Sequence, residues 1–321
     1  MPVTGGRALR LGAYASIWLI WGSTYLAIKW AVETVPPFLT VAIRSLAAGI
    51  ILVAWARLRE DQAPTRAQWI AAIGAGALYF LLGHGGLFWA EQRVATGPAA
   101  LMIATEHFWV VLIAWMLPGG QRPSRRAATG IAIGLVGVGL LTLAGGGEGG
   151  IDPLGAVVLL GASAAWAGGS IYFAGERRPA PPLYASGMPL VMGGVLLLGA
   201  SAAVGETARV TAADFTPVAI GSLAYLIIFG SVVAFTAFTW LVQTDGPSRA
   251  GSYAYVNPFV AVLLGWALAD EALTPRMLAA GAAIVLAVVL IVRGTRVQAP
   301  SQPPAPATPR RGSSALRERE A

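Results

Sequence analysis

Ten long apolar segments, separated by short breaks with charged residues, prolines or glycines, run through almost the whole chain. A helix needs about 20 apolar residues to cross the hydrocarbon core of a bilayer, and each segment is close to that length. The alternation of apolar and polar positions that a membrane barrel requires is absent. The pattern therefore predicts an all-α integral membrane protein. Its ten transmembrane helices are expected over residues 11–31, 38–56, 68–90, 97–117, 127–144, 153–174, 183–204, 217–241, 249–269 and 276–292.

The composition agrees with this pattern and excludes several soluble classes of protein. Hydrophobic residues make up 56% of the chain and charged residues 12%, whereas a soluble domain has about 45–50% and about 25%. So few charges cannot cover a water-soluble surface, which argues against a cytosolic enzyme and against a nucleic-acid partner. The chain has no cysteine and only two histidines, so we expect neither a structural metal site nor a cofactor.

The arginines predict the topology, because cytoplasmic loops of membrane proteins carry an excess of basic residues. With both termini in the cytoplasm, 17 arginines fall in cytoplasmic segments and only Arg93, Arg209 and Arg276 fall outside. The net charge of +7 is then explained by topology and needs no polyanionic partner. The Pro/Ser/Arg-rich segment 294–321 is predicted to be a disordered cytoplasmic tail.

The two halves of the chain align with each other at offsets of 145 and 151 residues. Each copy contains five predicted spans, and an odd number of spans places the second copy upside down in the membrane. Inverted repeats of this kind are typical of secondary transporters, whose substrate site lies at the repeat interface near the midplane. The aligned pairs include Trp21 with Trp166, Pro36 and Pro37 with Pro181 and Pro182, Trp89 with Trp240, Gln92 with Gln243, Phe108 with Phe259, and Trp115 with Trp266.

The repeat divides the chain into five predicted parts. They are a cytoplasmic N-terminus at 1–10, a first repeat with helices 1–5 at 11–144, a linker at 145–152, a second repeat with helices 6–10 at 153–293, and the tail at 294–321.

Two stretches of sequence resemble a known family. IWGSTYLAIKWAVETVPPFLTVAIRSLAAGI in helices 1 and 2 resembles the opening of EamA-type transporters of the drug/metabolite transporter superfamily, and AGSYAYVNPFVAVLLGWALADEALTPRMLAAGAAIVLAVVL resembles their closing motif. The resemblance covers roughly residues 10–293. It implies ten helices around a central cavity, and commonly the export of amino acids or other small metabolites across the bacterial inner membrane. Glu106 and His107 stand where many members have a proline, as Pro258 does in the second repeat, so we expect helix 4 to lack that kink.

Five ionisable residues lie within predicted spans, and all belong to the first repeat. A charge at the bilayer centre costs at least about 2.5–3.5 kcal/mol, so such residues usually face a cavity or a partner. Each also has a structural interpretation: the lysine can reach the headgroups, and the arginine and glutamate can form a buried pair. The five are Lys29, Arg44, His84, Glu106 and His107, and their second-repeat equivalents are Ala174, Pro189, Phe235, Asn257 and Pro258.

Helical spacing adds aromatic and polar neighbours to these charges. Cations would hold a carboxylate, the acid would hold an amine, and aromatic rings would hold the side chain of a small solute. The candidate substrate-binding residues are Trp21, Tyr25, Lys29, Arg44, His84, Glu106, Trp109, Tyr253 and Asn257.

The function that these features predict is secondary active or facilitative transport of a small organic metabolite, such as an amino acid or an amphipathic amine, by alternating access. The predicted partners are this small molecule and membrane lipids, with protons as a further candidate through Glu106. Two alternatives stay open: an intramembrane enzyme that uses Glu106 and His107 as an acid–base pair, and a non-transporting receptor or assembly subunit. Neither alternative needs an inverted repeat, and the HExxH and GxSxG motifs of known enzymes are missing.

Overall fold

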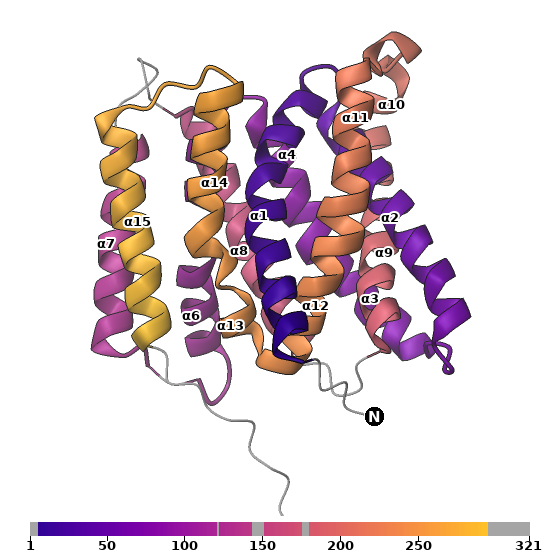
Figure 1. Cartoon of the computed structure of the whole chain (residues 1–321), viewed down its shortest axis with the longest axis horizontal. Coiled ribbons are helices and arrows are strands. Elements are labelled where there is room, and N and C mark those ends of the chain that lie inside the picture. The colour runs from indigo at the N-terminus through magenta and orange to yellow at the C-terminus, as the bar shows by residue number, and fades with distance from the viewer. Residues whose placement is uncertain (1–5, 121, 143–150, 175–179, 295–321) are drawn as a thin grey trace, which may run out of the picture.

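The computed structural model describes residues 6–120, 122–142, 151–174 and 180–294. Within these ranges the regular structure is helical, and the long helices stand side by side (Figure 1). Among the described residues, nine helices are long and apolar enough to cross a membrane, and Tyr253–Leu268 is a shorter apolar helix. The predicted all-α fold with ten membrane helices is therefore confirmed. The predicted linker and tail lie outside the described residues, apart from positions 151, 152 and 294.

The first five predicted spans correspond to elements α1 to α7. Their bounds are α1 Arg7–Val32, α2 Pro37–Arg59, α3 Arg66–Gly76 continued by the π-helical η1 Ala77–His84 and by α4 Gly85–Glu91, then α5 Thr96–Ile103, α6 Glu106–Met116 and α7 Arg125–Thr142.

The second five spans begin at α8. Their bounds are α8 Pro153–Ala174, α9 Pro182–Ala203, the short α10 Glu206–Arg209 and η2 Ala212–Asp214, then α11 Pro217–Tyr225 continued by the π-helical η3 Leu226–Val233 and by α12 Ala234–Asp245, and finally α13 Pro247–Ala250, α14 Tyr253–Leu268 and α15 Pro275–Gly294.

Equivalent helices of the two repeats pack against each other at the two ends of the molecule. Helix α2 lies along α9 on one side, and α7 lies along α15 on the other (Figure 1). The paired prolines explain why α2 and α9 begin at equivalent positions. Pro37 and Pro182 each occupy the first helical turn, where the missing N–H of proline costs no hydrogen bond.

The third helix of each repeat contains a π-helical segment, η1 in the first and η3 in the second. Such segments insert an extra residue into a turn, change which side chains face inward, and often occur at functional sites. In both copies the segment lies in the interior of a long helix, so each repeat has an irregular stretch of backbone within its third span.

Helix 4 differs from the sequence prediction, because it is interrupted without a proline. The helix stops at Ile103 and resumes at Glu106, so Glu106 lies in the first turn of α6 instead of the middle of one continuous helix. The physical cause is Thr105, whose hydroxyl bonds back to the main-chain oxygen of Met102 (2.6 Å) and to Ser163 Oγ of α8 (3.1 Å). This local bond competes with the helical ladder. The expectation of an unkinked helix 4 was therefore wrong.

The equivalent helix 9 is interrupted as well. The predicted span 249–269 divides into α13 and α14, and the turn between them ends at Ser252. Trp18 Nε1 of α1 donates to Ser252 Oγ (3.2 Å). Thus the hydroxyl residue at each interruption is held by the first helix of the other repeat, Thr105 by α8 and Ser252 by α1.

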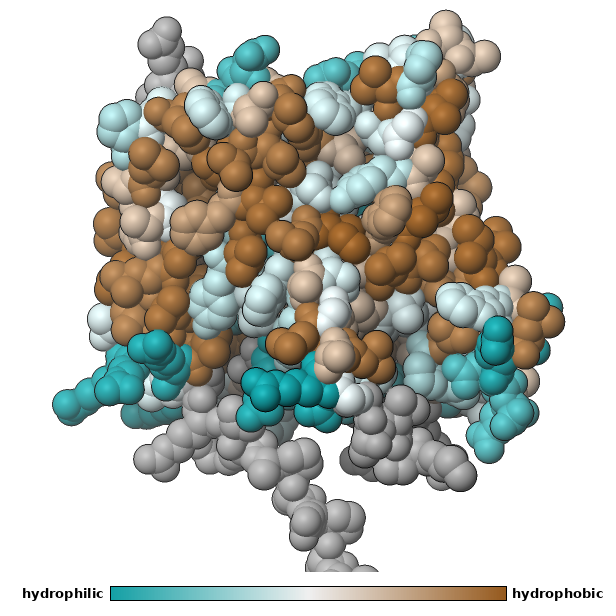
Figure 2. All heavy atoms as spheres, viewed as in Figure 1, coloured by the Kyte–Doolittle hydropathy of each residue, from teal (hydrophilic) through white to brown (hydrophobic). Residues whose placement is uncertain are grey.

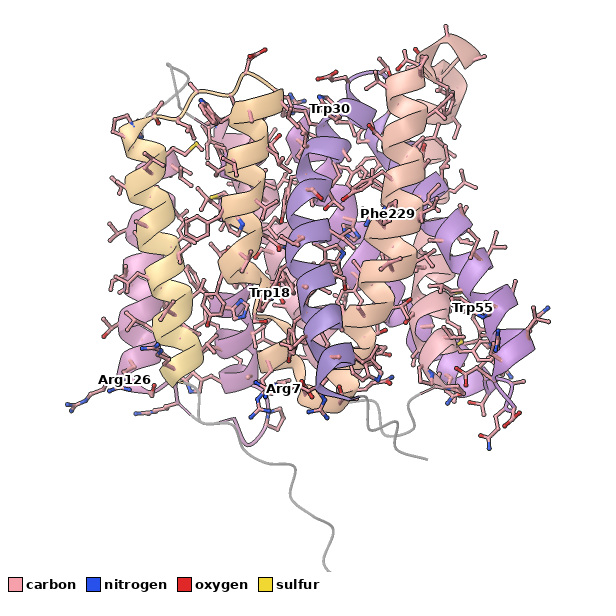
Figure 3. The ribbon with its side chains drawn as sticks, viewed as in Figure 1. Arg7, Trp18, Trp30, Trp55, Arg126 and Phe229 are labelled. Carbon is pink, nitrogen blue, oxygen red and sulfur yellow. The ribbon has the colours of Figure 1, made fainter. Side chains whose placement is uncertain are left out.

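The surface agrees with a membrane environment. Figure 2 shows hydrophobic residues over most of the visible outer face and hydrophilic residues gathered along the edge that carries the N-terminus. Figure 3 places Arg7 and Arg126 at that edge and Trp30 at the opposite one, so α1 crosses the full height of the molecule. Phe229 of η3 lies between these levels, which places this π-helical segment in the interior of the span (Figure 3).

Candidate functional site

A central cavity of about 50 Å³ lies between the two repeats. It is lined by residues of α1, α2, η1, α4 and α5 of the first repeat and of α8 and α14 of the second. Six of the nine sequence-predicted site residues line it. They are Trp21, Tyr25, Arg44, His84, Tyr253 and Asn257.

Arg44 supplies the charge on the cavity wall. It is only 2% exposed, and its Nε donates to Ser231 Oγ of η3 (2.8 Å). Its Cζ lies 5.7 Å from the centre of the Phe88 ring, which gives a cation–π contact. The Nη1 atom has no hydrogen-bond partner among the described residues. A buried guanidinium with an unused donor is suited to bind a carboxylate or another anion.

Glu106 lies behind the cavity wall and is reached through Tyr253. The carboxylate accepts a hydrogen bond from the Tyr253 hydroxyl at Oε2, and the same hydroxyl accepts one from Trp166 Nε1 (2.9 Å). Tyr253 lines the cavity, whereas Glu106 does not. The three side chains therefore form a chain of donors that leads from the cavity surface to a carboxylate that is 3% exposed.

Aromatic rings make up much of the wall around this chain of donors. The ring of Trp21 lies 5.8 Å from that of Trp166, 4.9 Å from Tyr253 and 5.1 Å from Phe238, mostly edge to face. Trp21 Nε1 also donates to the main-chain oxygen of Gly230 in η3 (3.0 Å). Rings held in this way keep their shape when the cavity is empty, and they offer apolar surfaces to a bound solute.

The three remaining predicted residues on the wall are Tyr25, which is buried on α1, His84 and Asn257. His84 is the last residue of the π-helical η1. Its ring lies 5.0 Å from that of Trp166, and its buried Nδ1 has no partner among the described residues. The Asn257 amide, oriented so that Nδ2 has acceptors, donates to the main-chain oxygens of Trp18 (2.9 Å) and Tyr253 (3.2 Å). Asn257 thus steadies the start of α14 just before Pro258.

Lys29 and Trp109 do not line the cavity. Lys29 Nζ forms an ion pair with Glu271 Oε1 at 3.0 Å, beyond the cavity wall. Trp109 is partly buried on α6, and its Nε1 has no described partner. The interruption of helix 4 also places Met102 on α5 and Glu106 and Trp109 on α6.

Sequence reasoning missed Trp166 and Ser231. Trp166 lines the cavity and donates to Tyr253; its alignment with Trp21 in the repeat was the signal that could have identified it. Ser231 holds Arg44, and no spacing or charge pattern marks it, because its position depends on the π-helical turn.

Two copies of one family pattern cover most of the chain. The model of the EamA-like transporter family matches residues 13–143 and 153–293. The chain belongs to the EamA-like transporter family. The resemblance seen in the sequence is confirmed, and this EamA-like protein is a multi-pass membrane transporter of the drug/metabolite type.

Relatives of this EamA-like transporter are known from several bacteria. It is 38% identical to the uncharacterized inner membrane transporter YedA of Escherichia coli (strain K12), over 88% of this chain and 90% of YedA. It is 26% identical to the uncharacterized transporter YvbV of Bacillus subtilis (strain 168), over 87% of this chain and 90% of YvbV. A solved protein crystal structure, 20% identical, shares the fold with a TM-score of 0.62 over 91% of this chain and all of the other.

Proposed function

We propose that the chain carries a small organic metabolite out of the cell across the bacterial inner membrane by alternating access, with both termini in the cytoplasm. The observation that carries this proposal is the central cavity, which is lined by both repeats and by irregular helical segments. A site between inverted repeats becomes accessible from either side when one repeat moves against the other. The name of the relative YedA supports the inner membrane, and the resemblance to exporters supports the outward direction.

The solute we propose carries a carboxylate and an apolar or aromatic body, as an amino acid does. Arg44 Nη1 would hold the carboxylate, because it belongs to a cationic group on the cavity wall and is a buried donor without a partner among the described residues. Trp21, Tyr25 and Trp166 would hold the body. If the solute has an amine, Tyr253 and Asn257 offer oxygen atoms to it. Glu106 acts behind Tyr253 and does not touch the solute.

We propose that Glu106 couples transport to protons. Its single described hydrogen-bond partner is the Tyr253 hydroxyl, and Tyr253 lines the cavity. A change in the protonation of Glu106 would reverse or break that hydrogen bond and so alter the cavity wall. Glu106 is bonded to Tyr253 and the ring of His107 lies 6.3 Å from that of Tyr255, so the two residues have different neighbours. Neither Glu106 nor His107 lines the cavity, which supports transport over acid–base catalysis by this pair.

Substitution of Arg44 tests the site directly. The purified chain would be screened by thermal shift against amino acids, amines and carboxylic acids, and each stabilising compound would then be tested for flux in proteoliposomes. Loss of a hydrogen bond to a charged group costs about 1.5–3 kcal/mol, so Arg44→Gln should weaken binding about 10- to 150-fold. Arg57→Gln is the matched control, because Arg57 is exposed on the same helix.

Two results would contradict the proposal. An unchanged ligand-induced shift in Arg44→Gln would remove Arg44 from the site. Failure of every stabilising compound to cross the proteoliposome membrane would argue against transport through this cavity.

A further inference from the structure

A second buried carboxyl group lies beyond one end of the cavity, on α4. Glu91 follows Leu87 by one helical turn, and Leu87 lines the cavity. On α1, Lys29 follows Tyr25 by one turn, and Tyr25 also lines the cavity. Four residues of an α-helix correspond to a rise of about 6 Å. Since α1 runs from Arg7 at one edge of the molecule to Trp30 at the other (Figure 3), these residues lie between the cavity and the edge opposite the N-terminus.

Glu91 has no hydrogen-bond partner among the described residues. It is only 5% exposed, and both of its carboxyl oxygens are buried and unpartnered within the part of the chain that the structure describes. The main-chain amide of Lys29 approaches the carboxyl group without meeting hydrogen-bond geometry. An ionised carboxylate that is buried without donors is strongly unfavourable. The ionised form of Glu91 is therefore disfavoured in this conformation.

Glu271 presents the opposite case a short distance away. It precedes α15 and accepts hydrogen bonds from Lys29 Nζ (3.0 Å), Thr96 N (2.8 Å) and Gly97 N (3.1 Å). Burial of Glu271 disfavours its charge, but these donors outweigh burial and lower its pKa below the ordinary value. Glu271 is therefore ionised, and it ties α1 to the start of α5 and to the segment before α15.

One ammonium group is thus shared unequally between two carboxyl groups. Lys29 is within electrostatic range of both Glu91 and Glu271, yet it contacts only Glu271. We propose that Glu91 is a proton-binding site, separate from Glu106, and that after losing its proton it competes with Glu271 for Lys29. Because Lys29 is then drawn away from the carboxylate that ties three segments together, loss of the proton loosens this end of the bundle.

The groups around Glu91 connect the site to the cavity. Tyr25 lines the cavity and interacts electrostatically with both Glu91 and Glu106. Release of the proton leaves an anion that Lys29 can neutralise when it exchanges partners. The titratable groups on the elements that pack against α4 or join its end include Tyr25 and Lys29 of α1, Arg44 of α2, Tyr79 and His84 of η1, Arg93 after α4, Asp152 before α8 and Tyr172 of α8. Glu271, before α15, also interacts electrostatically with Glu91.

The proton-binding site can be tested by stability alone. Because the folded chain holds a proton on Glu91 that the unfolded chain releases near neutral pH, Glu91 destabilises the fold increasingly as pH rises. Glu91→Gln removes this effect, so we expect a melting temperature about 2–4 °C above that of the native chain at about pH 8 and no gap at about pH 4. Glu33→Gln, at the exposed end of α1, is the control and should show no such pH-dependent gap.

Glu271→Gln should behave with the opposite sign. The folded-state pKa of Glu271 is lowered, so its contribution to stability is present above the ordinary carboxyl range and is lost as pH falls through the folded value. The variant should melt below the native chain at neutral pH and approach it in acid. Equal melting curves for native and Glu91→Gln at every pH, or a gap that follows Na⁺ concentration instead of pH, would overturn the proton-binding site.

The effect on opening rests on the proposed transport function and is tested separately. The chain has no cysteine, so a single Ala162→Cys substitution on the cavity wall reports access to the cavity. In right-side-out vesicles, labelling by a membrane-impermeant maleimide should increase with pH. After correction for the pH dependence of the thiol–maleimide reaction itself, Glu91→Gln should abolish this increase. Unchanged pH dependence in Glu91→Gln would overturn the role of Glu91. An Ala162→Cys thiol that reacts from neither side of the membrane would instead overturn alternating access itself.

Discussion

The two repeats share one scaffold but differ in chemistry. Trp21 and Trp166 occupy equivalent positions, and each indole donates a hydrogen bond into the centre of the molecule, to Gly230 O and to the Tyr253 hydroxyl. The π-helical segments and the interruptions in helices 4 and 9 recur in both copies. The five ionisable residues within the predicted spans of the first repeat have no ionisable equivalents in the second. Symmetry therefore produces the cavity, the asymmetric residue Arg44 places a charge on its wall, and the asymmetric residue Glu106 lies behind that wall.

The first test of this difference between the repeats is to neutralise Glu106, the carboxyl group that the second repeat lacks. If Glu106 carries the coupling proton, Glu106→Gln should abolish the dependence of transport on an imposed pH gradient while leaving solute binding in place, because Arg44 and the rings are untouched. The measurement is solute flux in proteoliposomes with and without the gradient, together with ligand-induced thermal shift. Tyr253→Phe should reduce the dependence on the pH gradient less, since it removes the hydroxyl that links Glu106 to the cavity and keeps the carboxyl group.

A gradient dependence that persists unchanged in Glu106→Gln would place the coupling group elsewhere. The control is Glu33→Gln, which removes an exposed carboxyl group and should keep the native gradient dependence.

Packing of equivalent glycines offers a second test, because the repeat is not symmetric there either. A Cβ at Gly130 of α7 would lie 2.7 Å from Ala287 O of α15, whereas one at Gly281 would lie 3.4 Å from a Leu101 methyl group. Overpacking costs about 1–3 kcal/mol, and alanine gains up to about 1 kcal/mol of helix propensity over glycine. Gly130→Ala should therefore lower the melting temperature, and Gly281→Ala should leave it unchanged or raise it.

Thermal unfolding of the two purified variants in one detergent checks this prediction. Equal losses of stability would mean that α7 and α15 do not approach as closely as the structure has them.

The sequence predicted the scaffold well for a physical reason. Ten apolar segments of bilayer length leave few alternatives, since backbone polar groups in lipid must be satisfied within helices. Local irregularities were harder to predict. Nothing in the sequence pattern marks the π-helical segments, and the bond from Thr105 to Met102 that interrupts helix 4 depends on a neighbour from α8.

The same limit applies to individual residues of the candidate site. Arg44 and Tyr253 were expected from charge and spacing, and the structure brings both to the cavity. The partner of Lys29 was not expected, because Glu271 lies 242 positions away and falls in a loop. Glu91 was missed for a simpler reason: the predicted span ended at residue 90, one position before it. Contacts between distant segments set the partners of buried charges, and hydropathy does not encode them.

The equivalent tryptophans provide the finest test of the comparison. Trp21→Phe and Trp166→Phe each keep an aromatic ring and delete one indole donor, so both should cost about 0.5–1.5 kcal/mol of stability. Their functional effects should differ. Trp166 donates to the Tyr253 hydroxyl that serves Glu106, so Trp166→Phe should shift the pH profile of transport. Trp21 donates to a main-chain oxygen, so Trp21→Phe should leave that profile in place. Matching pH profiles for the two variants would show that the chain of donors from Trp166 to Glu106 has no part in coupling.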